Sequence, residues 1–104
     1  MENKNKKIYT IEELKKILTP VFEKAPVYRA VLFGSYADGS ADEKSDVDII
    51  IDSKKKLTGL NFFGVMGTVE DITGKRVDMY DVREINPKSP IFKFIREGIV
   101  IYEK

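Results

Sequence analysis

The stretch Leu32-Phe33-Gly34-Ser35-Tyr36-Ala37-Asp38-Gly39-Ser40 is followed, after four residues, by Ser45-Asp46-Val47-Asp48-Ile49. The apolar run that ends at Phe33 predicts a buried strand that stops at a Gly-Ser turn. Backbone N–H groups of such a turn, together with the hydroxyl of Ser35, can bind an anion, especially where a helix begins. A triphosphate would fit a turn of this kind.

The second stretch carries two acids on one predicted strand. Side chains alternate along a strand, so Asp46 and Asp48 share one face while Val47 and Ile49 share the other. Their Cα atoms should lie about 6.6 to 7 Å apart, which lets two carboxylates converge on a pair of cations. Because the chain contains no histidine and no cysteine, the expected ions are Mg²⁺ or Mn²⁺.

Other phosphate and metal motifs do not fit these residues. A P-loop needs a lysine followed by serine or threonine after its second glycine, where this chain has Ser40-Ala41. An EF-hand needs a further ligand and a turn glycine, where this chain has Ile50-Ile51. A dinucleotide-binding fingerprint is absent as well.

A third acid follows within the segment Lys75-Arg76-Val77-Asp78-Met79-Tyr80. Asp78 falls on the face opposite Val77 and Met79, which favours it as a further site residue. Asp71 and Asp81 lie nearby in the sequence, so this choice is less specific than that of the first two acids.

Together these motifs resemble the nucleotidyltransferases with the DNA polymerase β palm fold, and most closely the minimal nucleotidyltransferases, many of which are bacterial antitoxins. The family signature is Gly-Ser, a short loop, Ser-Asp-x-Asp on a strand, and a third acid on a later strand. This chain matches it at Gly34-Ser35, at Ser45-Asp46-Val47-Asp48 and at Asp78. The similarity extends from about Ile11 to Tyr102.

The resemblance implies roles for six residues. The catalytic acids, which would hold two Mg²⁺ ions, with Mn²⁺ as a substitute, are Asp46, Asp48 and Asp78. The residues expected to contact the nucleotide are Gly34, Ser35 and Ser45. Asp78 would also take the proton of the attacking hydroxyl, a role worth about 10²- to 10⁴-fold. The implied reaction is attack of a hydroxyl on the α-phosphate of a nucleoside triphosphate, with ATP expected, and loss of pyrophosphate.

The resemblance also implies a partner. The minimal members commonly pair with a small helical toxin of the HEPN ribonuclease type, and some silence it by adenylylating a tyrosine. Two alternatives stay open: an antitoxin that neutralises its toxin by binding alone, and transfer to a small molecule such as an aminoglycoside. Asp38 stands where close relatives often carry arginine, which should weaken nucleotide binding unless Lys44, Lys75 or Arg76 compensates.

Length and charge predict one domain with a mixed surface. The chain has 104 residues and a net charge of +1, so we expect a single domain over residues 10–104 after a flexible polar tail over residues 1–9. The balanced charge argues against direct nucleic-acid binding. No apolar segment follows the basic start of the chain, so we expect no signal peptide, no membrane span and a cytoplasmic location, with oligomers possible.

Periodicity predicts helices packed on a small mixed sheet, an α/β sandwich, and the resemblance implies that this sandwich is of the polymerase β palm type. Thr10 and Glu13 form a capping box for a first helix, which Pro20 should kink or split. A later helix should end at Gly74. Gly64 and Gly67 lie on one side of it and each costs about 0.5 to 1 kcal/mol relative to alanine. The remaining predicted elements are strands over residues 28–33 and 46–52, a short helix after Ser35, a strand at Asp78, a last helix from Ser89 to Glu97 and a final strand to Tyr102.

Overall fold

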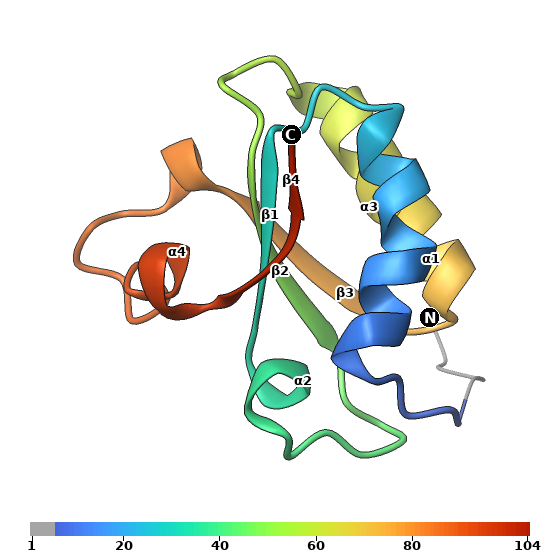
Figure 1. Ribbon diagram of the computed structural model, residues 1–104. Helices are drawn as coiled ribbons and strands as arrows, with labels where there is room; N and C mark the ends of the chain where they lie inside the picture. The colour runs from blue at the N-terminus through green and yellow to red at the C-terminus, as the bar shows by residue number, and fades with distance from the viewer. Residues whose placement is uncertain (1–5) are drawn as a thin grey trace.

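Four strands form one mixed sheet, in the order β3-β2-β1-β4, in the computed structural model, which describes residues 6–104 (Figure 1). The strands are β1 (Arg29–Phe33), β2 (Val47–Asp52), β3 (Val77–Asp81) and β4 (Ile99–Glu103). β1 pairs antiparallel with both β2 and β4, whereas β2 and β3 are parallel. A parallel pair needs a long crossover, which the helix α3 (Gly59–Thr73) supplies. The predicted small mixed sheet is confirmed.

The first helix, α1 (Ile11–Glu23), begins at the predicted capping box. The Thr10 hydroxyl accepts a hydrogen bond from the Glu13 N–H at 3.1 Å, and the Glu13 carboxylate accepts one from the Thr10 N–H at 2.9 Å. Pro20 lies inside this helix without splitting it. Leu14, Leu18 and Phe22 are fully buried on both sides of the proline, so packing on the sheet holds the two parts in one helix.

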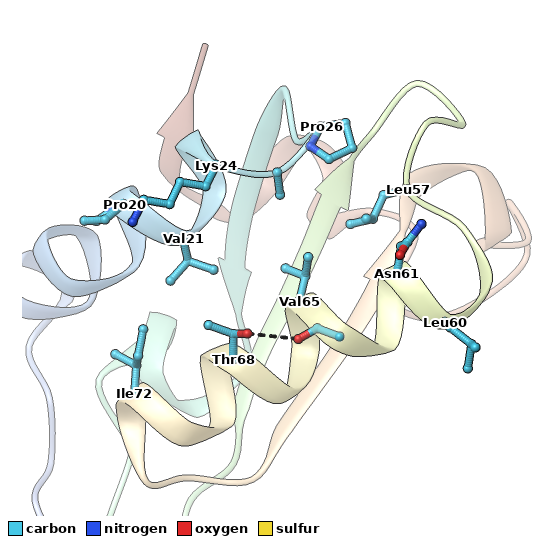
Figure 2. Close-up of a pocket in the computed structure, with 12 residues that line it drawn as sticks. Pro20, Val21, Lys24, Pro26, Leu57, Leu60, Asn61, Val65, Thr68 and Ile72 are labelled. Carbon is cyan, nitrogen blue, oxygen red and sulfur yellow. Dashed lines mark hydrogen bonds between the residues drawn. The ribbon is translucent and has the colours of Figure 1, made fainter.

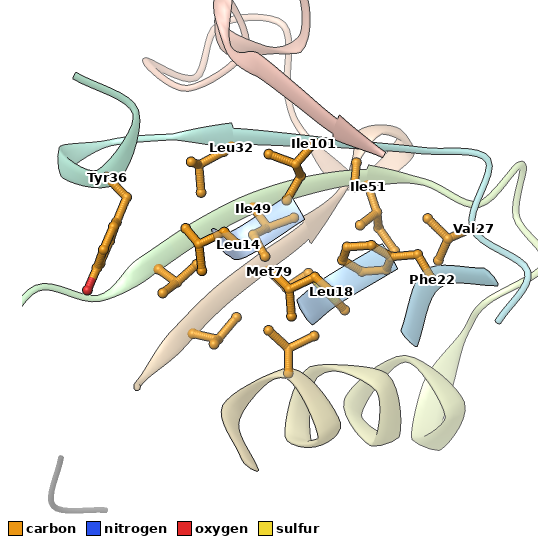
Figure 3. Close-up of a cluster of buried hydrophobic side chains, with 14 of the residues drawn as sticks. Leu14, Leu18, Phe22, Val27, Leu32, Tyr36, Ile49, Ile51, Met79 and Ile101 are labelled. Carbon is orange, nitrogen blue, oxygen red and sulfur yellow. The ribbon is translucent and has the colours of Figure 1, made fainter. Parts of the chain in front are cut away.

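The two faces of the sheet are covered differently. α1 and α3 lie on one face (Figure 1) and enclose the main core, in which side chains of α1 meet those of the sheet (Figure 3). The sheet residues of this core include Leu32, Ile49, Ile51, Met79 and Ile101. On the other face, Val31, Phe33 and Ile50 pack with Ile85 and with residues of the short helices η1 (Val82–Glu84) and α4 (Phe94–Glu97).

The prediction of a last helix from Ser89 to Glu97 is wrong in its start, because α4 begins only at Phe94. Residues 89–93 form successive turns instead: the Phe92 N–H donates to the Ser89 carbonyl at 3.1 Å and the Phe94 N–H to the Ile91 carbonyl at 3.0 Å. Ile91, Phe94 and Ile95 all pack on the second face of the sheet. Tertiary packing therefore overrides the local signal of a serine followed by proline.

Part of the predicted N-terminal tail, residues 1–5, lies outside the described residues. In the remaining part, Lys7 forms an ion pair with Glu13 at 2.8 Å. The Tyr9 hydroxyl donates a hydrogen bond of 2.8 Å to the carbonyl of Thr73, the last residue of α3. These contacts attach residues 7–9 to the domain. Within residues 6–104, no helix has both the length and the apolar composition needed to cross a membrane.

Candidate active site

Two of the predicted acids are direct neighbours on the sheet. The parallel register of β2 and β3 pairs Asp48 with Asp78, and the antiparallel register of β1 and β2 pairs Phe33 with Asp48. Val47 and Val77, which directly precede the two acids on their strands, belong to the main core. Because side chains alternate along a strand, the two carboxylates project from the opposite face, the face that also carries α4.

Asp46 completes the acidic group from just outside the strand. It directly precedes β2 and is half-buried, as are Asp48 and Asp78. The pKa of Asp48 is raised to about 6, first by partial burial and then by the charges of Asp78 and Asp46 and a hydrogen bond with Asp78. The three acids therefore share one crowded, negatively charged region at the end of the sheet.

This region has the chemistry of a divalent-cation site. Carboxylate oxygens are the ligands that Mg²⁺ and Mn²⁺ prefer, and a cation between Asp48 and Asp78 would remove the repulsion that raises the pKa of Asp48. Among residues 6–104, no three acidic side chains already stand in position to hold one ion together. A site that uses all three acids therefore requires side-chain rotation when an ion binds.

Gly34 brings the backbone into contact with the acids. It separates β1 from the short helix α2 (Ser35–Asp38) and has φ +73° and ψ −154°, a conformation that is essentially restricted to glycine. A Cβ atom at this position would overlap Oδ2 of Asp48. The backbone at the start of α2 therefore lies directly beside Asp48, so an anion bound to this turn would lie next to the acidic region.

The two predicted serines differ in their present contacts. Ser35 is half-buried and is the first residue of α2. The Ser45 hydroxyl accepts a hydrogen bond from the Asp42 N–H at 2.8 Å and donates one to the Asp42 carboxylate at 3.2 Å. Ser45 therefore stabilises the loop that leads to Asp46, and a nucleotide contact would need this hydroxyl to turn.

Of the basic residues near the site, one is buried and two are exposed. Lys75 is buried, and its ammonium donates to the Glu43 carbonyl at 2.9 Å, which joins the segment before β3 to the loop before Asp46. Burial lowers the pKa of Lys75. Lys44 and Arg76 are exposed and are better placed to meet an added anion.

Two other acids have local structural partners. The Asp38 carboxylate accepts a hydrogen bond from the Ser40 N–H at 2.9 Å, and its bonds to Ser40 lower its pKa. Asp81 is buried and accepts a hydrogen bond from the Ser53 hydroxyl at 2.5 Å. It pairs with Ile51 at the far end of β3 from Asp78. Asp71, the other acid that the sequence leaves open, is exposed on α3. The structure thus separates Asp78 from both Asp71 and Asp81.

Tyr80, to which the sequence assigns no role at the site, lies close enough to the acidic region to feel the charges of Asp78 and Asp48. It is 39% exposed, and its ring centroid is 6.3 Å from that of Phe33. Burial raises the pKa of its hydroxyl, with smaller contributions from the charges of Asp78 and Asp48. Its spacing of two residues from Asp78, which puts both on one strand face, was the signal available in the sequence.

The chain resembles known proteins over almost its whole length. Residues 12–104 match the family model described as "Polymerase beta, Nucleotidyltransferase". A relative from Thermococcus cleftensis, named protein adenylyltransferase MntA, is 36% identical over 95 residues, which cover 88% of this chain and 94% of the relative.

Solved structures show the same fold. A candidate minimal nucleotidyltransferase is 26% identical with a TM-score of 0.72, covering 88% of this chain and 95% of that one. A chain of a toxin–antitoxin structure with AMP-PNP is 17% identical with a TM-score of 0.74, covering 86% of this chain and 73% of that one. At this identity the second similarity concerns the fold alone.

Proposed function

Because this chain belongs to the polymerase β nucleotidyltransferase family and is a nucleotidyltransferase, we propose that it transfers the adenosine monophosphate of ATP to a hydroxyl group of a partner protein. The partner that we propose is a HEPN-type toxin, with this chain as its antitoxin. The name of the Thermococcus relative, protein adenylyltransferase, supports a protein as acceptor.

One observation carries the proposal: Asp48 and Asp78 are paired in register on adjacent strands, and the glycine turn at Gly34 contacts Asp48 directly. This arrangement puts a backbone suited to phosphate beside carboxylates suited to a divalent cation. Asp46 lies close enough for its charge to raise the pKa of Asp48, so the three acids can act on one ligand.

We assign the metal ligands to Asp46, Asp48 and Asp78. Mg²⁺ bound there would orient the triphosphate and neutralise charge on the attacking and leaving oxygens. Gly34, which has no side chain, would let the phosphates approach the start of α2. There the N–H groups of Ser35 and Tyr36 come before the first bonded donors, Ala37 and Asp38, which donate to the Gly34 carbonyl. Ser35 is the first residue of α2, and its hydroxyl would donate a hydrogen bond to the same phosphates.

The transfer step is a substitution at the α-phosphorus. The acceptor oxygen forms a bond to this phosphorus, the bond from the α-phosphorus to the oxygen bridging to the β-phosphate breaks, and pyrophosphate leaves. We propose that Asp78 takes the proton that the acceptor hydroxyl loses. Since ATP is a cytoplasmic nucleotide, the reaction would take place in the cytoplasm.

The competing proposal is an antitoxin that only binds its toxin. Asp38 at the position where relatives often carry arginine favours it, because an acid beside the phosphate turn repels a triphosphate. Asp38 is the last residue of α2, and hydrogen bonds from Ser40 hold its carboxylate against the turn that follows. Transfer to a small molecule such as an aminoglycoside is the third candidate function.

The deciding experiment uses label at two positions of ATP. The purified chain, Asp48→Asn and the matched control Asp71→Asn are incubated with Mg²⁺ and either α-labelled or γ-labelled ATP in a lysate of the native host. Asp71 is exposed and lies on α3, so its variant changes the same charge away from the site. We expect α-label on one protein with wild type and Asp71→Asn, and no label with Asp48→Asn.

Three outcomes distinguish the candidates. Label from the α-position alone supports nucleotidyl transfer to a protein and identifies the acceptor by its mass. Binding of a partner without transfer of any of the four nucleotides supports the binding-only antitoxin. Modification of an aminoglycoside by the purified chain without a partner would indicate the small-molecule enzyme.

A further inference from the structure

A groove on the helical face lies away from the acids, but its lining does not identify a ligand. It has a volume of about 540 Å³ and runs between the end of α1 and the outer side of α3, where Val21 and Val65 line its walls (Figure 2). Among the described residues that line it, Lys24 is the one that carries a charge. The surface around Tyr28, directly before β1, differs from this groove because it has a definite charge.

Three ammonium groups gather around the ring of Tyr28 and form, with it, the Tyr28 cluster. The Nζ atoms of Lys54, Lys56 and Lys104 lie 4.3, 5.2 and 5.1 Å from the ring centroid. Lys56 also donates a hydrogen bond of 2.6 Å to the Tyr28 hydroxyl. The backbone joins the segments involved, since the Tyr28 N–H donates to the Asp52 carbonyl at 2.8 Å and the Lys104 N–H to the Tyr28 carbonyl at 2.9 Å. The pairing of the strands therefore brings the three lysines together.

The positive charge of the Tyr28 cluster is not neutralised by an ion pair. Among residues 6–104, none of its three lysines pairs with an acidic side chain. The acids next to these lysines in the sequence have other contacts: the Asp52 carboxylate accepts a hydrogen bond from the backbone N–H of Lys54 at 3.0 Å, and Glu103 pairs with Arg29 at 3.5 Å. Three like charges around one ring repel one another, so an added anion would relieve this repulsion.

The turn that carries two of these lysines has a backbone conformation that lysine disfavours. Lys54 and Lys55 have φ +51° and +65°, and the Lys56 N–H donates to the Ser53 carbonyl at 2.9 Å. Turns with positive φ at both central residues ordinarily contain asparagine and glycine there. The chain thus carries lysine in this turn at a cost in stability, and backbone strain of this kind is concentrated at functional positions.

We propose that the Tyr28 cluster binds the phosphate group of a small ligand, either free phosphate or a phosphate monoester. Lysine binds phosphate as a point charge, and the several oxygens of one phosphate can accept from several donors at once. The Tyr28 hydroxyl accepts its bond from Lys56, so its own proton is left to donate to a phosphate oxygen. That bond also lowers the pKa of the hydroxyl, which makes it a stronger donor.

The same geometry argues against single-stranded nucleic acid as the ligand. Proteins that bind single strands stack the bases on aromatic rings, but the Lys54 ammonium lies over the Tyr28 ring at 4.3 Å from its centroid. A net charge of +1 for the whole chain also provides no extended basic surface along which a strand could bind. A single phosphate group fits this local cluster better.

The Tyr28 cluster is separate from the acidic region. Tyr28 comes directly before β1 and Gly34 directly after it, and at about 3.3 Å per residue the two lie about 20 Å apart along the strand. Binding at the cluster uses no divalent cation and none of the residues that we assign to transfer. The inference therefore goes beyond the proposed reaction.

The test titrates the wild-type chain with inorganic phosphate and, separately, with AMP, and follows the backbone amide signals by NMR. Divalent cations are left out, and sodium chloride keeps the ionic strength constant. We expect both ligands to shift the amide signals of Tyr28, Lys54 and Lys104, while the signals of Gly34 and Ser35 report on the acidic end separately. Equal affinity for the two ligands supports recognition of phosphate alone, and tighter binding of AMP supports a phosphate monoester.

Lys54→Asn and its matched control Lys55→Asn change the same charge in the same turn. Both lysines are exposed and have positive φ, and asparagine tolerates that conformation, so both variants should fold. Lys54 contacts the Tyr28 ring, whereas Lys55 is not one of the three lysines around it. We expect Lys54→Asn to weaken phosphate binding about fivefold and Lys55→Asn by less than about twofold. Tyr28→Phe keeps the ring but loses the hydroxyl, and should weaken binding about fivefold as well.

Several results would overturn the proposal. One is the absence of any shift around Tyr28 with tens of millimolar phosphate or AMP. Another is equal weakening by Lys54→Asn and Lys55→Asn, which would indicate diffuse attraction to a basic surface. Tighter binding of a single-stranded oligonucleotide or a glutamate-rich peptide than of AMP would also overturn it, by assigning the cluster to a macromolecule. Since no divalent cation and no transfer step are involved, failure here leaves the transfer proposal standing, and failure of transfer leaves this measurement unaffected.

Discussion

Gly34 and Gly64 show how differently the two ends of this molecule are determined. At the acidic end, the backbone conformation and the contact with Asp48 both exclude any other residue at position 34. On the outer face of α3, nothing in the chain requires the glycine at position 64. The first region is specified by the protein itself. The second is not, and the following predictions test this contrast.

The largest expected effect is on transfer at the acidic end. Asp48→Asn keeps the shape of the side chain but removes the charge that we propose holds the cation, so the rate of α-label transfer should fall by about 10³-fold. A rate within threefold of wild type would show that Asp48 is not part of the machinery. The same substitution at Asp71 should change the rate by less than threefold.

Gly34→Ala should destabilise the protein through the turn at the acidic end. The alanine must adopt a backbone conformation restricted to glycine, and its Cβ would overlap the Asp48 carboxylate. We expect a loss of about 3 kcal/mol in the free energy of unfolding, measured by urea denaturation. An equally stable variant would mean that the turn can rearrange without cost.

Ligand binding at the acidic end should raise the free energy of unfolding of the protein. Mg²⁺ with a non-hydrolysable ATP analogue at about 100 times its dissociation constant should add about 2.7 kcal/mol to the free energy of unfolding. Asp48→Asn and Asp46→Asn should fold and lose this response, whereas Gly64→Ala should keep it. A response in both acid variants equal to that of wild type would contradict the assignment of these ligands.

The free energy of unfolding should depend on pH through the acidic end, because the pKa of Asp48 differs between the folded and the unfolded chain. The folded-state pKa of Asp48, about 6, exceeds its ordinary value of 3.8. Its ionisation therefore opposes folding: the penalty is absent at a pH well below 3.8, grows between 3.8 and about 6, and is complete above that value. Allowing for solvent screening of this half-exposed group, we expect Asp48→Asn to be more stable than wild type by about 1 to 2 kcal/mol at pH 7.5 without metal.

At about pH 3, below both pKa values, the two proteins should have equal stability in the same urea titration, since Asp48 is then protonated in both the folded and the unfolded wild type. Comparing the variant with wild type cancels the titration of the other acids. A difference that does not change between the two pH values would show that it arises from packing and not from the charge.

The smallest effect belongs to the outer face of α3. Gly64→Ala should raise the free energy of unfolding by about 0.5 to 1 kcal/mol, because alanine favours helix and meets no neighbour. Chemical denaturation measures this gain. A loss of stability instead would mean that the helix is packed more tightly at Gly64 than the open space around it indicates, and the contrast with Gly34 would disappear.

Much of the architecture could be predicted from local signals. The capping box at Thr10 and the end of a helix at Gly74 follow from patterns that act over a few residues. The start of α4 could not, because Ile91 and Phe94 pack on a sheet formed by residues far away in the sequence. The predicted helix from Ser89 failed for that reason.

The candidate site shows the same division. The sequence identifies Asp46 and Asp48 through their spacing on one strand. It does not specify the neighbour of Asp48 across the sheet, because the register of a parallel pair depends on how the crossover packs. The pairing with Asp78, the contact with Gly34 and the exposure of Tyr80 beside the acids appear only in three dimensions.

The position of β4 has a consequence for how the chain folds during synthesis. β4 pairs with β1, about seventy residues earlier, and contributes Ile101 to the main core. A ribosome therefore releases β1, β2 and β3, with their apolar faces, before the strand that covers the open edge of β1 has emerged. Contacts over such separations form slowly, and unpaired strand edges favour aggregation. Release of the last strand should thus be the step that commits the nascent chain to its folded form.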